Sequence, residues 1–290
     1  MAAPSFVLEY LPLQITLYSI ENAKLPPFLG STLRGAIGQA LLKDKLLYDF
    51  LFNNKSLSHG KKDIPNPYLL DLPDTNQFEF KPEEELTFKI LLFGEAFEYT
   101  QAIVNALKEK ELGLGAARYP FKLKQVKHEI DQRIIWKDGN YYEEAVCSFL
   151  LPYRTLSNVT RVILRTLTPL RIRRNGQLLT DIDFVTVIRN ITNRLATLTS
   201  RYGGWVDEVE VQRIQNLAYQ VEIVHSNFAL VDLARYSNRL GEKMDFSGLM
   251  GSIEVQGDLT PFVPWLFAAQ TLHLGRNTTF GMGKIEVEFI

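Results

Sequence analysis

The order of strand and helix signals along the chain predicts an α+β fold built from two halves of the same design. In each half the signals run strand, helix, strand, strand, helix, strand, the pattern of tandem ferredoxin-like (RRM-like) domains. The pattern starts again near residues 150–160. We therefore expect an N-terminal domain at residues 1–152, with an inserted loop at 53–84, and a C-terminal domain at 153–290 that carries a glycine-rich loop.

The first half begins with one long strand or a strand pair, because residues 6–20 are rich in β-branched and aromatic side chains. Residues 28–52 favour a helix, with Arg34 on a different side from the apolar residues at helical spacing: Leu29, Leu33, Ile37, Ala40 and Leu41. The segment 53–84, rich in Asn, Lys, Gly, Pro and Asp, predicts a long loop. A strand buried on both faces (84–94), an amphipathic helix (95–111) and a returning strand (117–130) complete this half.

The second half repeats the order. Residues 168–174 predict a strand with Leu170 and Ile172 on one face and the arginines at 171 and 173 on the other. A helix capped by Asp181 or Asp183 follows, with an apolar stripe at Phe184, Ile188, Ile191, Leu195 and Leu198. Strands are expected at 208–214, 218–228 and 251–259, then a helix at 260–270 and a last strand at the C-terminus.

Composition excludes several classes of protein. The 290 residues are 46% apolar and 22% charged, as in globular proteins, and no run of about 18 apolar residues could cross a membrane. The first residues lack the basic and apolar segments of a secretory signal, so we expect a cytoplasmic protein. The single cysteine, Cys147, permits neither a disulfide framework nor a Cys-based zinc site.

Charge is informative through its distribution, since the net charge is only -1. Residues 161–174 contain five arginines and no acid: Arg161, Arg165, Arg171, Arg173 and Arg174. Such a run is either a solvated face or an RNA contact in which guanidinium groups pair with phosphates. Both interpretations stay open at this stage.

The segment 274–284 contains the strongest local signal for a binding site, with Gly275, Gly281 and Gly283 in a short stretch. Glycine lets backbone approach a ligand closely, and exposed N–H groups flanked by cations and hydroxyls predict an anion-binding concavity; the flanking residues are Arg276, Lys284, Thr278 and Thr279. The alternative is a hairpin-like turn that needs glycine for its dihedral angles. The loop does not match GxxxxGK[ST] or a dinucleotide fingerprint, so no nucleotide cofactor is expected.

Several segments in order resemble one family. They include LPPFLGSTLRGAIGQALL, LGLGAARYPFKLKQV, TPLRIRRNG, DLARYSNRLGEKMDFSGLMGSIEVQGDL and LHLGRNTTFGMG, and together they extend over most of the chain. The sequence is similar to the CRISPR-associated repeat-processing endoribonucleases, the sixth Cas protein family of the RAMP superfamily. The resemblance implies two ferredoxin-like folds, binding of CRISPR repeat RNA, and metal-free cleavage on the 3′ side of its hairpin. Cysteines that often follow the first helix in related sequences are absent here.

Metal-free RNA cleavage needs a base for the 2′-hydroxyl proton, an acid for the leaving 5′-oxygen, and a donor for the phosphate charge. His273, two residues before Gly275, would face the same cavity as the loop, and a core position is its alternative. His59 is the second candidate, because the family's usual histidine comes from near the end of the first helix. His128 and His225 are expected to be structural or surface residues. No carboxylate pair and no HxxxH pattern is present, so neither a metal nor a cofactor is expected.

Further RNA contacts are expected from Arg235 and Arg239, four residues apart on one predicted helical face beside Tyr236, and from Arg34. The expected activity is endonucleolytic cleavage of CRISPR precursor transcripts within the repeat, giving a 2′,3′-cyclic phosphate. A non-catalytic RAMP subunit that holds crRNA, and a ferredoxin-like scaffold without RNA, are the alternatives. The expected partners are precursor crRNA and other Cas effector subunits, with no membrane, in a monomer or homodimer.

Overall fold

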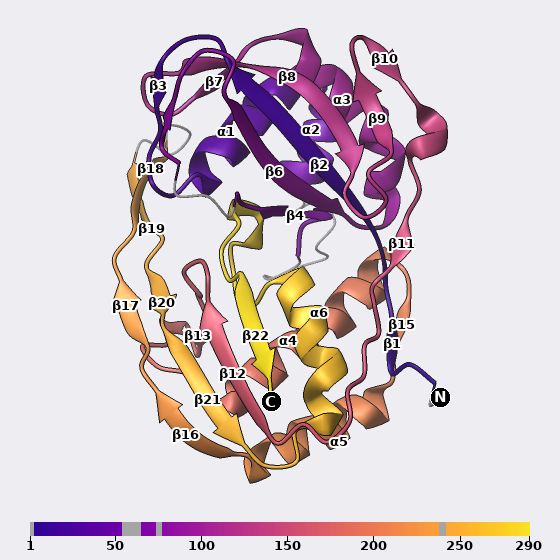
Figure 1. Ribbon diagram of the computed structural model, residues 1–290, viewed down its shortest axis with the longest axis vertical. Coiled ribbons are helices and arrows are strands. Elements are labelled where there is room, and N and C mark those ends of the chain that lie inside the picture. Colours follow the sequence, from indigo (N-terminus) through magenta and orange to yellow (C-terminus); the bar gives the residue numbers. More distant parts are fainter. Residues whose placement is uncertain (1–2, 54–64, 74–76, 238–241) are drawn as a thin grey trace. The chain divides into compact units, whose positions relative to one another are not determined.

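The computed structural model describes residues 3–53, 65–73, 77–237 and 242–290 (Figure 1). The chain separates into two compact units, an N-terminal unit of residues 9–150 and a C-terminal unit of residues 151–290 joined by the first eight residues. The start of the chain belongs with the second unit because β1 (Phe6–Val7) pairs with β15 (Trp205–Val206). The Phe6 and Trp265 rings, whose centroids are 5.1 Å apart, extend this attachment into the core.

The N-terminal unit has an antiparallel sheet whose main strands lie in the order β8, β2, β6, β4. These strands are β2 (Glu9–Ser19), β4 (Tyr68–Asp71), β6 (Glu85–Leu92) and β8 (Tyr119–His128). Helix α1 (Gly30–Leu41) follows β2, and α3 (Thr100–Glu109) follows β6. Numbered along the chain, the strand order is 4-1-3-2 with a helix after strands 1 and 3, which is the ferredoxin-like arrangement.

Shorter elements complete this unit. They are α2 (Lys45–Phe52), the pair β3 (Ala23–Lys24) and β5 (Glu79–Phe80), β7 (Leu112–Leu114), β9 (Ile134–Lys137), β10 (Asn140–Tyr141) and β11 (Phe149–Leu150). Parts of the predicted loop at 53–84 thus form β4 and β5, while residues 54–64 and 74–76 lie outside the described residues.

The apolar periodicity of this half is confirmed. Leu29, Leu33, Ile37 and Leu41 of the first helical region are buried, and Ala40 packs partly against the same core. In β6 the alternate residues Leu86, Phe88, Ile90 and Leu92 are buried as well, together with Leu91, but Thr87 and Lys89 are only partly buried, so the prediction of burial on both faces is wrong for the first part of this strand. The sequence period therefore identified the face of each element that the core covers.

The C-terminal unit has a four-stranded antiparallel sheet in the order β16, β21, β12, β22. Its strands are β12 (Arg161–Thr166), β16 (Glu222–Ser226), β21 (Ser252–Gln256) and β22 (Ile285–Phe289). Helix α4 (Phe184–Tyr202) follows β12, and α6 (Val263–Leu272) follows β21. From the other edge the order is again 4-1-3-2, so the predicted α+β fold of two tandem ferredoxin-like halves is confirmed.

Asp183 caps α4, because its carboxylate accepts a hydrogen bond from the Thr186 N–H at 2.7 Å. The whole predicted apolar stripe of this helix is buried. The cap and the stripe were both readable in the sequence because each depends only on residues within a few positions along the chain.

The prediction of a strand at residues 168–174 is wrong. The first strand of this half is β12, and Leu170, Arg171 and Ile172 are all buried in succession rather than alternating. Leu170 makes an isolated bridge to Leu249. Beyond it, β13 (Arg173–Arg174) and β14 (Gln177–Leu178) form a small hairpin around Asn175 and Gly176, both with positive φ.

The strand predicted at 208–214 is also wrong, because this segment is the helix α5 (Glu208–Leu217). Asp207 caps it by accepting from the N–H groups of Val209 and Glu210, and Glu210 pairs with Arg213 one turn later. The alternation of Glu and Val suggested a strand, but Val209 is 81% exposed. The cap and the i,i+3 ion pair stabilise a helix, whereas no sheet packs against the alternating residues to stabilise a strand.

The predicted helical face of Arg235 and Arg239 is wrong too. Arg235 lies in β18 (Ala234–Ser237), which pairs with β19 (Glu242–Asp245), and Arg239 lies outside the described residues. A second pair, β17 (Ala229–Val231) with β20 (Gly248–Met250), continues the same excursion. None of the helices within the described ranges is long and apolar enough to cross a membrane.

Candidate nucleic-acid interface

The glycine-rich loop connects α6 to β22 through a chain of left-handed residues. His273, Gly275, Asn277, Gly281 and Gly283 all have positive φ, between 58° and 74° for the first three and 71° and 76° for the last two. A single 3-10 turn, Thr278–Phe280, lies between them. The loop is therefore a defined, tightly wound structure.

Two of its glycines are required by close backbone contacts. A Cβ atom at Gly275 would lie 2.5 Å from the carbonyl oxygen of Arg171, and one at Gly283 would overlap the carbonyl oxygen of Leu274. Both contacts are to backbone, which cannot move aside as a flexible side chain can. The glycines thus let the loop pack on itself and on the segment that contains Arg171.

The predicted concavity of exposed N–H groups is wrong for most of the loop. The N–H of Gly275 donates to the Asn190 side chain (2.8 Å), that of Arg276 to the Arg171 carbonyl (2.8 Å) and that of Gly283 to the Pro169 carbonyl (3.0 Å). The N–H of Lys284 donates to the Thr168 hydroxyl at 2.9 Å. These groups hold the loop in place, because buried amides must find partners.

His273 is the residue that ends α6, just before the loop, and it has the buried helix-end position that was the alternative to facing a cavity. Its side chain and backbone are buried, with 1% exposure, and Nδ1 is 3.3 Å from the carbonyl oxygen of Met282. The alternative histidine, His59, lies outside the described residues.

One predicted contact residue, Thr278, is brought together with Arg194, a residue of α4 that sequence reasoning did not single out. Thr278 and Thr279 are buried at 7% and 6% exposure, while Arg276 is partly exposed. Arg194 of α4 donates from Nη2 to the Thr278 hydroxyl at 2.9 Å. Lys284, also partly exposed, is the last loop residue before β22.

Arg194 had one signal in the sequence. Arg194 follows Ile191 and precedes Leu195 and Leu198 of the buried stripe, and it comes four residues after Asn190. Both polar residues therefore lie along the edge of the packed face. An arginine beside an apolar stripe reads as an ordinary surface residue. Only the packing of the loop against α4 distinguishes it.

The arginine run is divided by the fold. Arg171 is 4% exposed and donates to the carboxylate of Asp245 (2.6 Å) and the carbonyl of Ser247 (2.5 Å). The Arg171 guanidinium is the main cause that holds the pKa of Asp245 far below its usual value. Arg173 and Arg174 are exposed on the hairpin, and Arg174 donates to the Thr186 hydroxyl at 2.8 Å. Arg161 and Arg165 form ion pairs with Glu254 and Glu288 across the sheet.

Arg34 belongs to the N-terminal unit, on α1, with its guanidinium carbon 4.6 Å from the centre of the Phe52 ring. In the same unit His128 is fully buried between the Cys147 carbonyl and Asp131, and burial lowers the pKa of this imidazole. His225 is exposed on β16.

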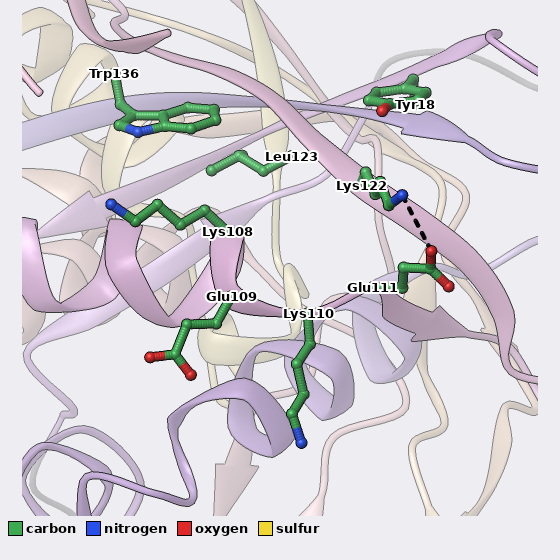
Figure 2. Close-up of a pocket in the computed structure, with 8 residues that line it drawn as sticks. All are labelled: Tyr18, Lys108, Glu109, Lys110, Glu111, Lys122, Leu123 and Trp136. Atoms are coloured by element: carbon green, nitrogen blue, oxygen red, sulfur yellow. Dashed lines mark ion pairs between the residues drawn. The ribbon is translucent and has the colours of Figure 1, made fainter. Parts of the chain in front are cut away.

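Figure 2 shows a pocket of the N-terminal unit, lined by Tyr18, Lys108, Glu109, Lys110, Glu111, Lys122, Leu123 and Trp136. Lys122 and Glu111 form an ion pair of 3.2 Å across it. Glu109 pairs with Lys43 at 2.7 Å. Lysines and glutamates alternate along its wall, so its positive charge is largely balanced.

Within the described ranges, no group of three or more His, Cys, Asp or Glu side chains is arranged to hold a metal ion. This statement covers neither His59 nor the rest of residues 54–64.

Comparison with known proteins adds two family models. One, described as an N-terminal domain, matches residues 8–146. The other, CRISPR-associated endoribonuclease Cas6, matches residues 164–285, a range that contains α4, α6 and the glycine-rich loop. An uncharacterized protein of Archaeoglobus fulgidus is 25% identical, with 98% of this chain and 99% of that protein aligned.

Solved structures share the fold at low identity. A Cas6 product complex matches with a TM-score of 0.58 and 13% identity, covering 96% of this chain and all of that one. A Thermus thermophilus Cas6 gives 0.55 and 14%, covering 99% and 100%. A partial Cas6-RT-Cas1–Cas2 complex gives 0.59 and 14%, where this chain spans 47% of a longer chain. The chain thus matches the model of CRISPR-associated endoribonuclease Cas6 over residues 164–285, the range that holds the loop, and shares the fold of these structures along nearly its whole length.

Proposed function

We propose that this protein cleaves CRISPR precursor transcripts within the repeat, without a metal, by attack of a 2′-hydroxyl on the adjacent phosphate to give a 2′,3′-cyclic phosphate. The observation that carries the proposal is the loop between α6 and β22. It contains a histidine and two cationic residues, and no Asp or Glu occurs from residue 259 to residue 285. An acid-free, cationic segment beside a histidine suits a phosphodiester substrate.

The proposed cleavage reaction requires no catalytic groups other than side chains of the protein. The nucleophile belongs to the RNA, so the protein must accept one proton, supply another and stabilise charge on the phosphate oxygens. His273 is proposed for proton transfer, with His59 as the alternative. Arg276, Lys284, Thr278 and Thr279 are proposed to contact the RNA, with Arg173, Arg174, Arg34, Arg235 and Arg239 as further contacts.

Arg171 is a weaker contact than its place in the arginine run implied. Its guanidinium is buried and already donates to a carboxylate and a carbonyl. We propose that it supports the loop through its own carbonyl, which accepts from the Arg276 N–H, and through the ion pair with Asp245.

One observation favours the second candidate, a subunit that holds crRNA without cutting it. His273 is only 1% exposed, so RNA reaches its ring only if the loop opens. A closed loop would still offer Arg276 and Lys284 to a phosphate backbone. Association with other Cas subunits belongs to both candidates, and a monomer or homodimer is compatible with either.

The deciding experiment is single-turnover cleavage of the cognate repeat RNA in EDTA, beside the same RNA with a 2′-deoxy substitution at the scissile position. Cleavage of the first RNA alone, with a cyclic phosphate or its hydrolysis product, supports the proposal. Binding without cleavage, with or without magnesium, would leave the guide-binding candidate in its place.

A further inference from the structure

The Arg194 guanidinium is a cation whose charge the fold does not compensate. Twelve ion pairs join the described residues, and Arg194 takes part in none of them. Its one hydrogen bond is to the neutral hydroxyl of Thr278. Its Nε is enclosed by protein and has no acceptor. A guanidinium carries five N–H donors, so most of its capacity is unused.

The Arg194 side chain is partly exposed, and the withdrawal of its charge from part of the solvent has an energetic cost. Desolvation lowers the pKa of Arg194 to about 10, so the side chain stays protonated at neutral pH while it loses part of its hydration. Charges that protein withdraws from solvent are normally paired or coordinated. Arg171, in the same unit, follows that rule with its Asp245 partner.

The position of Arg194 indicates which kind of ligand could compensate its charge. Asn190, one turn earlier on α4, accepts the Gly275 N–H, while Arg194 donates to Thr278, so this face of the helix lies along the loop. The loop brings Arg276 and Lys284 and no acid. A ligand at this place would meet cationic and hydroxyl donors, which together recognise a phosphate rather than a neutral group.

We propose that Arg194 and the Thr278 hydroxyl form a subsite for one phosphodiester of the bound RNA, with the partly exposed guanidinium of Arg194 as its cationic donor. The inference rests on the proposed function for the identity of the ligand as RNA. It adds to that function a residue outside the glycine-rich loop, on the helix that supports it.

The test compares Arg194→Gln with Arg189→Gln on the same helix, whose guanidinium donates to the Tyr219 hydroxyl at 2.6 Å. Both variants lose one positive charge, so global electrostatics change equally. Arg194→Gln should weaken binding of the cognate repeat RNA at least about 10-fold and reduce the slope of log K against log salt by about 0.7, the value for one phosphate on single-stranded RNA. Arg189→Gln should change the affinity less than 2-fold, and Arg194→Lys should restore part of the loss.

A second probe separates this inference from the proposed function. Inorganic phosphate, at constant ionic strength with chloride as reference, should raise the Tm of the wild-type protein and of Arg189→Gln, but not that of Arg194→Gln. If the wild-type protein binds no repeat RNA while phosphate still acts through Arg194, the proposed function fails and the anion subsite stands. If RNA binds and Arg194→Gln behaves like Arg189→Gln with both probes, the subsite is wrong and the function stands.

A purely structural role for Arg194 makes a different prediction. A residue that only holds the loop should lower the Tm when it is lost, without changing the RNA affinity of the folded protein. Under our proposal the ligand-free Tm of Arg194→Gln is unchanged or higher, because the substitution removes an uncompensated charge that is partly withdrawn from solvent. A lower Tm with unchanged affinity would overturn the subsite.

Discussion

The pocket of the N-terminal unit and the glycine-rich loop of the C-terminal unit both contain cations, but only the pocket also has acidic residues of its own. In the pocket Lys122 pairs with Glu111, and glutamates alternate with lysines at 108–111. From residue 259 to residue 285 there is no acid, and Arg194 beneath the loop has no ion-pair partner within the described residues. A cation indicates an anion site when the fold leaves its charge uncompensated. A cation that already forms an ion pair is stabilised by its acidic partner, so it gains little from binding a phosphate.

The largest expected effect tests whether chemistry belongs to the loop. His273→Asn removes the imidazole and keeps a polar side chain that can donate and accept hydrogen bonds at this position. We expect the single-turnover cleavage rate to fall at least about 10²-fold, the size of a lost general acid or base, with affinity for repeat RNA within a few-fold.

Lys108→Gln in the pocket is the control and should leave that rate unchanged. If His59→Ala lowers the cleavage rate by the same factor and His273→Asn does not lower it, proton transfer must be assigned to the first half of the chain. If neither histidine matters, positioning and electrostatic stabilisation by cations must account for the rate.

The next effect concerns how rigidly the loop is built. Gly283→Ala adds a Cβ against the carbonyl oxygen of Leu274 at a φ of 76°, so both a clash and backbone strain are expected. We expect a loss of about 2–3 kcal/mol in the free energy of unfolding, measured by urea denaturation.

Gly176→Ala in the same unit provides the comparison. Its φ is 82°, and nothing lies within 4 Å of the added atom, so only the conformational cost of about 1 kcal/mol applies. Equal losses in the two variants would mean that the loop relaxes around Gly283 and is less tightly packed than its contacts indicate.

A third prediction compares the two cationic regions directly through salt dependence. Arg173, Arg174 and Arg276, all replaced by Gln, should flatten the slope of log K against log salt by about 2, at about 0.7 per phosphate contact. Lys108, Lys110 and Lys122, replaced by Gln, should leave it unchanged because the pocket is not expected to hold RNA. If the slope of log K against log salt is flattened in the lysine variant alone, the RNA-binding site must be assigned to the N-terminal unit.

The smallest effect contrasts the compensated Arg171 with the uncompensated Arg194. The pKa of Asp245 is lowered by Arg171, so its contribution to stability is present above the unfolded pKa, near 3.8, and is lost as pH falls towards the folded value. Asp245→Asn should reduce the free energy of unfolding by about 1 kcal/mol at pH 7, a modest value because this carboxylate is 57% exposed. The difference from wild type should shrink progressively as the pH falls below about 4, and a difference that does not change between pH 7 and pH 2 would exclude the ion pair as its cause.

The sequence alone determined the elements whose causes are local. The tandem strand and helix order, the Asp183 cap, the buried stripe of α4 and the alternation in β6 all follow from side chains within one or two turns of each other. The same local reasoning left two positions open for His273, a cavity at the loop and the end of a helix, and the residue is buried at the end of α6. Its failures at 168–174 and 208–214 arose where the pattern of charges and apolar residues fitted a strand that no neighbouring strand completed.

Tertiary structure decided which cations are available. Arg171 lies in an arginine run and Arg194 beside an apolar stripe, and neither setting shows whether the charge is paired. In the structure Arg171 forms an ion pair with Asp245, whereas Arg194 donates only to a hydroxyl. Their partners lie 74 and 84 residues away. The electrostatic state of a side chain depends on every charge and every layer of protein within several ångströms of it, and those neighbours are set by how the loop packs on α4 rather than by their order along the chain.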